Sequence, residues 1–124
     1  MADRKILVPD ASHPISIRPS SVTVVVREGA YQFARSSSAW TLTEASYAPV
    51  QYIPRGDVDM SLLERSQHTT YCPYKGDANY YSIPALGASG INSVWTYEKP
   101  FEAVGEIAGC LAFYPDRVSI ELAD

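Results

Sequence analysis

Tyr71-Cys72-Pro73-Tyr74-Lys75-Gly76-Asp77-Ala78-Asn79-Tyr80-Tyr81-Ser82 is the stretch that decides the fold, because it places a thiol, an ammonium group and turn residues among several tyrosines. Pro73 fixes φ and lacks a backbone donor, and Gly76 can adopt a positive φ, so the centre predicts a tight turn. The flanking residues 68–71 and 80–83 include many β-branched and aromatic side chains, which favour strands. The stretch therefore predicts a hairpin that presents the thiol and the ammonium group at its turn.

The composition is that of one globular domain without a membrane segment. At 124 residues the chain is long enough to bury roughly two thirds of its unfolded surface, so it needs no disulfide or metal to fold. No window approaches the roughly 18 consecutive apolar residues of a membrane helix. The apolar run at residues 6–8 is too short for a secretory signal. We therefore expect a cytoplasmic protein with no membrane partner.

The charge and the cysteine content bear on possible partners and on a possible disulfide. The net charge is −4, and the ten lysines and arginines are scattered rather than gathered in a stripe, so a nucleic acid is not an expected partner. The two cysteines are Cys72 and Cys110, and reduced thiols are the rule in the cytoplasm. We expect no disulfide between them.

Short β-rich segments separated by turn signals dominate the rest of the chain. Residues 1–21 contain three prolines and little periodicity, which predicts an N-terminal arm rather than an element of the body. Residues 22–124 are expected to form a single β-rich domain. Hairpins are predicted for 22–27 with 31–35 and for 110–114 with 117–122, and short helices for 60–65 and 101–108. The fold class is therefore mainly β, with one or two short helices.

Glu44 lies on a row of apolar side chains. Residues 39–44 alternate with a period of two, which places Trp40, Leu42 and Glu44 on one face of a strand. A carboxylate on a row that faces the core is costly unless it is paired. Either Glu44 closes the row at the rim of the core, or it meets a cation.

Several spaced motifs occur along the chain. They are His13-Pro14-Ile15, Tyr52-Ile53-Pro54-Arg55-Gly56-Asp57-Val58, Cys72-Pro73-Tyr74-Lys75-Gly76 with Tyr80-Tyr81-Ser82, Trp95-Thr96-Tyr97 ahead of Pro100, and Ile107-Ala108-Gly109 leading to Ala112-Phe113-Tyr114-Pro115-Asp116. Together they resemble the uncharacterised bacterial family called domain of unknown function 427, and the resemblance covers nearly everything after His13. Several motifs in this order are far more specific than any one of them.

The resemblance implies antiparallel sheets in a β-tent or barrel-like arrangement, because the family is similar to the β-tents of Rab-accessory exchange factors and methionine-R-sulfoxide reductases. Those relatives commonly hold a structural zinc with two Cys-x-x-Cys pairs, which this sequence lacks, so no metal is expected. No cofactor is expected either. The family is sometimes labelled nucleotidyltransferase-like, a label that the residues themselves must support.

Two candidates for catalysis each have a simpler explanation. Lys75 follows Cys72 across the turn and could stabilise a thiolate nucleophile, but a lone cysteine beside proline is more often a small buried side chain. Asp57 and Asp59 could share a magnesium ion, but capping of a helix by Asp59 accounts for one of them. An enzyme that uses Cys72, or a transferase-like activity, stays an alternative.

Charged and aromatic residues from separate motifs together describe a pocket for a small ligand. Arg55 and Lys75 supply donors for an anion, and Glu44 and Asp57 could orient them. The flat walls and the thiol beside them come from Tyr52, Tyr80, Trp95, Tyr97 and Cys72. The expected function is the binding of a flat or anionic metabolite. The alternatives are an assembly protein, such as a homodimer formed through a tyrosine-rich surface, and aromatic side chains that only fill the core.

Overall fold

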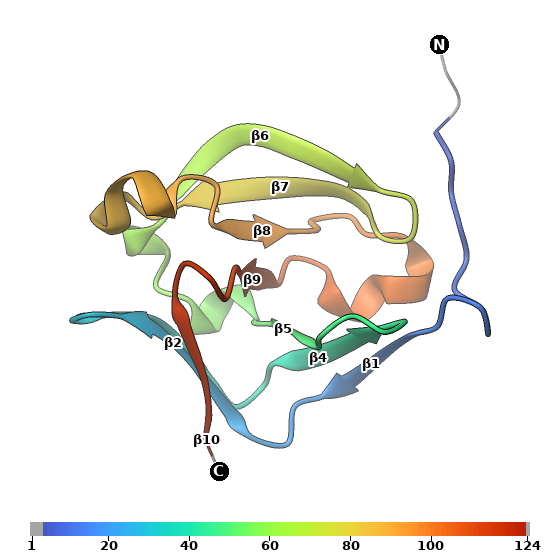
Figure 1. Ribbon diagram of the computed structural model, residues 1–124, viewed down its shortest axis with the longest axis horizontal. Helices are drawn as coiled ribbons and strands as arrows, with labels where there is room; N and C mark the ends of the chain where they lie inside the picture. The colour runs from blue at the N-terminus through green and yellow to red at the C-terminus, as the bar shows by residue number, and fades with distance from the viewer. Residues whose placement is uncertain (1–3, 124) are drawn as a thin grey trace.

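The computed structural model describes residues 4–123, and their regular elements are mainly strands (Figure 1). The strands are β1 (Ile15–Pro19), β2 (Thr23–Glu28), β3 (Tyr31–Ser36), β4 (Trp40–Glu44), β5 (Val50–Tyr52), β6 (Glu64–Cys72), β7 (Gly76–Ser82), β8 (Val94–Thr96), β9 (Leu111–Phe113) and β10 (Ser119–Ala123). The short 3-10 helices are η1 (Arg55–Asp57), η2 (Met60–Leu62), η3 (Pro84–Gly90) and η4 (Glu102–Ile107). No helix within residues 4–123 is long and apolar enough to cross a membrane.

The strands form three antiparallel sheets, with the orders β1-β4-β5, β10-β2-β3 and β6-β7-β8-β9. Two backbone hydrogen bonds of 2.8 Å join Ile53, just after β5, to Leu111 in β9, and so link the first sheet to the third. Figure 1 shows β9 and β5 between β8 above and β4 below. The prediction of a mainly β fold with antiparallel sheets is confirmed, and the sheets do not close into a barrel.

The two hairpins that the sequence marks most clearly are present. β6 and β7 pair up to Cys72 opposite Gly76, so residues 73–75 form the predicted turn. Gly76 has a φ of +109°, a conformation that side chains with a Cβ rarely adopt, which explains the glycine at this position. β2 and β3 also pair as predicted, with a bulge between Val26 and Arg27.

Part of the predicted N-terminal arm is a strand. Residues 15–19 form β1, which pairs with β4 along its whole length. Ile15 and Ile17 alternate along β1 and pack against buried residues. Pro14 precedes the strand and Pro19 closes it, positions where a missing N–H costs the ladder little. The prediction of an arm without a regular element is therefore wrong for this part.

The last two predicted strands do not form a hairpin with each other. β9 pairs with β8, and β10 pairs with β2 in a different sheet. Ile120 on β10 packs against the same buried cluster as Val24 and Val26 on β2. Burial of this side chain favours the pairing with β2 over a local hairpin, which a turn signal at Pro115 alone could not reveal.

The predicted helices are short 3-10 segments. Asp59 caps η2 as predicted, since its carboxylate accepts a hydrogen bond of 3.2 Å from the Ser61 backbone N–H, but the helix ends before β6 begins. In η4, Val104 and Ile107 are buried as the predicted spacing requires. The backbone of Val104 leaves the helical region at φ −125°, which interrupts this helix after its first turn.

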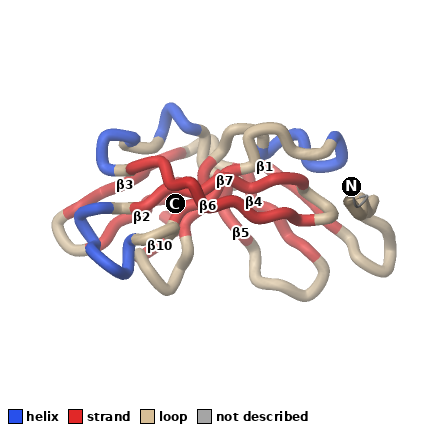
Figure 2. The backbone as a smooth tube through the Cα atoms, turned by 90° about the horizontal axis from the view of Figure 1, so that it is seen from above, coloured by secondary structure: helices blue, strands red, loops and turns tan. Residues whose placement is uncertain are grey.

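Two buried clusters fill the interior. The first core contains Val24, Val26, Phe33, Ala34, Ala39, Ile53, Val58, Tyr81, Ile83, Val94, Leu111, Phe113 and Val118. The second core contains Leu42, Tyr52, Ala78, Tyr80, Tyr97, Val104, Ile107, Cys110 and Ala112. In the view of Figure 2 the strands run through the middle of the molecule and the helical segments lie toward its margins. The second core is the richer in tyrosine, and it borders the candidate site.

Candidate functional site

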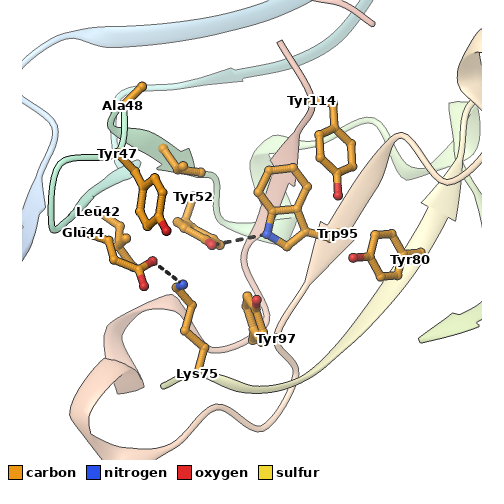
Figure 3. A pocket seen from close by; sticks show the side chains of 11 residues that line it. Leu42, Glu44, Tyr47, Ala48, Tyr52, Lys75, Tyr80, Trp95, Tyr97 and Tyr114 are labelled. Atoms are coloured by element: carbon orange, nitrogen blue, oxygen red, sulfur yellow. Dashed lines mark hydrogen bonds and ion pairs between the residues drawn. The ribbon is translucent and has the colours of Figure 1, made fainter. Parts of the chain in front are cut away.

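A cavity of about 280 Å³ lies beside the second core (Figure 3). Its lining residues are Leu42, Glu44, Tyr47, Ala48, Val50, Tyr52, Lys75, Tyr80, Trp95, Tyr97 and Tyr114. They belong to β4, β5, β7 and β8 and to the adjoining loops, so the cavity lies between the first and third sheets. The lining includes six of the predicted site residues, which are Glu44, Tyr52, Lys75, Tyr80, Trp95 and Tyr97. We call this cavity the tyrosine pocket.

A buried ion pair occupies one end of the tyrosine pocket. Lys75 Nζ donates to Glu44 Oε1 at 2.5 Å, and His13 Nε2 lies 2.7 Å from Glu44 Oε2. The Lys75 and Glu44 side chains are only 9% and 14% exposed. Burial alone would raise the pKa of Glu44, but the hydrogen bonds with Lys75 and His13 outweigh it and lower the pKa below its ordinary 4.5. Glu44 therefore meets a cation, one of the two outcomes that its position in the sequence allowed.

The N-terminal segment, residues 4–13, brings His13 to this ion pair. The backbone N–H of Leu7 donates to the Pro73 carbonyl at 2.9 Å, which fastens the segment to the turn between β6 and β7. The His13 ring stacks on Tyr74, with 4.1 Å between ring centroids and an angle of 8° between planes. The imidazole is thus held between the turn and the carboxylate, and it limits how far the carboxylate can move.

Aromatic rings from different elements form the walls of the tyrosine pocket. The rings of Tyr52 and Trp95 meet edge to face at 89°, and the indole Nε1–H donates to the Tyr52 hydroxyl at 3.2 Å. Tyr114 lies against the other side of Trp95, with 4.5 Å between centroids. The Tyr80 hydroxyl is bonded to Thr70 at 2.9 Å. These contacts hold the walls in place without a ligand.

Tyr97 differs from the other buried tyrosines. It is only 7% exposed, yet no group within residues 4–123 forms a hydrogen bond with its hydroxyl. Figure 3 shows this hydroxyl directed into the pocket, on the side of Tyr52 and Trp95. Burial raises the pKa of Tyr97 and of Tyr52 well above 10, so both phenols stay protonated. An unpaired donor therefore faces the cavity.

Cys72 lies next to the pocket but does not line it. Its Sγ is 3.8 Å from Lys75 Nζ, so the predicted approach of thiol and ammonium group is present. The thiol is half-buried, and Lys75 lines the cavity whereas Cys72 does not. Cys110 is buried, which raises the pKa of its thiol. Both cysteines are free, as predicted.

Arg55 and Asp57 lie outside the tyrosine pocket, although the sequence grouped them with it. Arg55 Nη1 donates to the Tyr81 hydroxyl at 3.0 Å, at the edge of the first core. Asp57 accepts a hydrogen bond of 2.6 Å from the hydroxyl of Ser36. The strand direction after Ile53 accounts for this, because the chain turns through η1 toward the opposite core. Of the two acidic residues that were expected to orient the cations, only Glu44 contacts Lys75, and Asp57 contacts Ser36 instead.

Three residues of the site were missed as candidates. His13 and Tyr114 stand inside motifs that the resemblance uses, but each was treated as part of a motif and not as a pocket residue. Tyr47 lies in the loop between β4 and β5, where no periodicity shows which way a side chain points. A histidine in an extended segment pairs with whatever the tertiary fold brings to it, so the contact with Glu44 had no local signal.

Fold and site together define a mainly β domain with a tyrosine-lined pocket that has a buried ion pair at one end. A family model described as "Domain of unknown function (DUF427)" matches residues 16–124, and the chain belongs to this family. The resemblance drawn from the spaced motifs is thereby confirmed. No curated protein matches the chain.

Proposed function

We propose that the tyrosine pocket binds a small flat metabolite, with aromatic rings as its walls and Lys75 as a donor at one end. The observation that carries this proposal is the Tyr97 hydroxyl, which sits on a buried residue, has no hydrogen-bond partner within residues 4–123 and is directed into the cavity, from which it can be reached. A neutral hydrogen bond contributes about 0.5 to 1.5 kcal/mol, and a ligand acceptor in the cavity would gain one from this hydroxyl. The volume of about 280 Å³ suits a molecule of one or two rings.

Thermal shift against a panel of metabolites tests the proposal. Compounds with a planar ring should raise the melting temperature of the wild-type protein, because a molecule that binds only the folded state stabilises it. Tyr97→Phe should reduce these shifts, since it removes only the unpaired hydroxyl. Tyr31→Phe is the matched control, because Tyr31 is 45% exposed on β3 and does not line the pocket. A panel that leaves the melting temperature unchanged at saturating concentrations would remove the pocket as a binding site.

We further propose that this binding takes place in the cytoplasm and involves no nucleic acid. Two free cysteines support a reducing compartment, and a net charge of −4 opposes a polyphosphate partner.

A homodimer is the second candidate. Leu122 is 57% exposed on β10, which is the edge strand of its sheet, so a second chain could cover an apolar edge. A strictly monomeric mass at a protein concentration of tens of micromolar, measured by light scattering, would remove this candidate without touching the ligand proposal.

A further inference from the structure

The end of the tyrosine pocket that holds the ion pair has hydrogen-bond donors to spare. A lysine ammonium group has three N–H donors. Lys75 directs one to Glu44 at 2.5 Å and one toward Cys72 Sγ at 3.8 Å, and no third acceptor lies within residues 4–123. The Tyr97 hydroxyl is unpaired, and the Tyr52 hydroxyl accepts from Trp95 but donates to no described group. Three donors therefore remain for a ligand.

Acceptors at the same end are already engaged. Glu44 is the one carboxylate among the lining residues, and both of its oxygens have a partner, Lys75 on Oε1 and His13 on Oε2. A ligand that presents a hydrogen-bond donor here would have to share an oxygen that already accepts a hydrogen bond. A ligand that presents an oxygen acceptor would instead complete the pairing of the spare donors.

Charge decides what kind of oxygen fits. The charges of Lys75 and Glu44 cancel, and these are the only residues of the lining with a charge at neutral pH. His13 pairs with the other oxygen of Glu44 and does not line the cavity, so a ligand carboxylate would find no cation in the lining beyond the one that Glu44 already neutralises, and would leave one negative charge uncompensated. Such a charge is expensive to bury, whereas a carbonyl oxygen accepts the same hydrogen bonds without it.

We infer that the tyrosine pocket takes an uncharged planar molecule whose carbonyl oxygen is held by Lys75 and Tyr97, and that it discriminates against carboxylates of the same shape. This inference rests on the proposed function and chooses between its two ligand types, flat and anionic. The flat ring packs against the aromatic lining, to which Tyr52 and Trp95 contribute. The neutral oxygen lies at the end where the spare donors converge.

Two isosteric pairs of compounds test this, benzamide with benzoate and nicotinamide with nicotinate. Each would be titrated into the full chain labelled with ¹⁵N, and binding would be followed by the indole N–H signals of the two tryptophans. Trp95 lines the pocket and Trp40 does not, so Trp40 serves as an internal control. We expect the amides to shift the Trp95 signal and to bind at least about tenfold more tightly than the matching acids.

Two variants sharpen the result. Tyr97→Phe should weaken amide binding by about fivefold, the loss of one neutral hydrogen bond. Glu44→Gln leaves the Lys75 charge uncompensated and should reverse the preference, so that the acids bind more tightly than the amides. Where Glu44→Gln fails to fold, the wild-type preference and the Tyr97→Phe loss decide the question.

The outcomes separate the inference from the proposal on which it rests. Acids that bind the wild-type protein as tightly as the amides, at Trp95, would overturn the inference and leave a ligand pocket in place. Probes that shift neither tryptophan signal, together with an unresponsive metabolite panel, would overturn the proposed function itself. Amide binding that Tyr97→Phe leaves unchanged would overturn the assignment of the oxygen to that hydroxyl.

Discussion

The first and second cores treat their buried tyrosines differently. In the first core, the hydroxyl of Tyr81 accepts hydrogen bonds from Arg55 at 3.0 Å and from Arg65 at 3.3 Å. In the second core, the Tyr97 hydroxyl has no partner within residues 4–123 and faces a cavity. Tyr81 is 5% exposed and Tyr97 is 7% exposed, so the difference is one of pairing and not of depth.

This difference separates a closed part of the interior from a part that borders an open cavity. The first core joins residues from two of the three sheets in a mostly aliphatic cluster, as Phe33 on β3 and Leu111 on β9 show, and Ile53 adds to it from just beyond β5. The second core leaves the Tyr97 hydroxyl without a protein partner beside an open volume. Under the proposed function, a ligand acceptor would complete the pairing of this hydroxyl.

A substitution that breaks the packing of the first core should lower the free energy of unfolding more than any other change considered below. Phe33 is fully buried, and its ring centroid lies 6.4 Å from that of Phe113. Phe33→Ala removes this packing and leaves a cavity, so the free energy of unfolding should fall by about 3 to 5 kcal/mol. Urea denaturation followed by tryptophan fluorescence measures the loss. Gln32→Ala is the control, because Gln32 lies on the same strand and its side chain is exposed. Equal losses of stability for the two variants would contradict the prediction that burial in the first core stabilises the fold.

Breaking the ion pair between Lys75 and Glu44, beside the second core, should cause the next largest loss of stability. Lys75→Met leaves the Glu44 carboxylate half of a buried pair without its cation, which should cost about 3 kcal/mol. Adding Glu44→Gln to Lys75→Met should recover part of this stability, because no charge then remains unpaired. The comparison of both single variants with the double variant, by urea denaturation, isolates the coupling. Strictly additive losses would show that the two side chains do not interact.

Acid should weaken the second core through the same carboxylate. The pKa of Glu44 in the folded protein lies below the ordinary 4.5, so its contribution to stability is complete above that value and is lost as the pH falls through the folded pKa. Between pH 5 and pH 3, about the range in which carboxylates titrate, wild-type stability should therefore fall more steeply than that of Glu44→Gln. Denaturation curves at fixed pH values measure both slopes, and parallel slopes would contradict the lowered pKa.

Most of the strand pattern could be predicted from the sequence because its signals are local. The turn at residues 73–75 and the hairpin of β2 with β3 follow from proline, glycine and β-branched residues that act over a few positions. The pairing of β1 with β4 and of β10 with β2 could not be predicted in this way. Ile17 and Ile120 find their burial against strands far along the chain, and no local turn signal records that choice.

The site was predictable to the extent that its residues share motifs. Lys75 and Tyr97 were grouped correctly because both stand in distinctive stretches, whereas Arg55 joined them only through its charge. The sequence places Glu44 on an inward row but does not show which cation it meets. The feature on which the proposed function rests, the Tyr97 hydroxyl without a protein partner, depends on what surrounds an atom in three dimensions and has no counterpart in residue spacing.

The smallest expected effect is also the sharpest test of the comparison between the cores. Tyr81→Phe and Tyr97→Phe each remove one oxygen from a tyrosine of nearly equal burial. In the first core the change takes an acceptor from Arg55 and Arg65, so the free energy of unfolding should fall by about 1 kcal/mol. In the second core it removes a hydroxyl without a partner, so stability should stay unchanged or rise by up to about 1 kcal/mol.

Urea denaturation of both variants in ligand-free buffer measures this difference. With a planar amide bound, Tyr97→Phe should become less stable than the wild-type protein. A ligand acceptor gives the Tyr97 hydroxyl the partner that it lacks in the free protein, so the wild-type protein should gain more stability from the amide than Tyr97→Phe does. Tyr81→Phe should gain as much as the wild-type protein, because its hydroxyl lies in the other core. A Tyr97→Phe variant that loses as much stability as Tyr81→Phe without ligand would show that the hydroxyl is already satisfied, and the distinction between the two cores would then rest on the cavity alone.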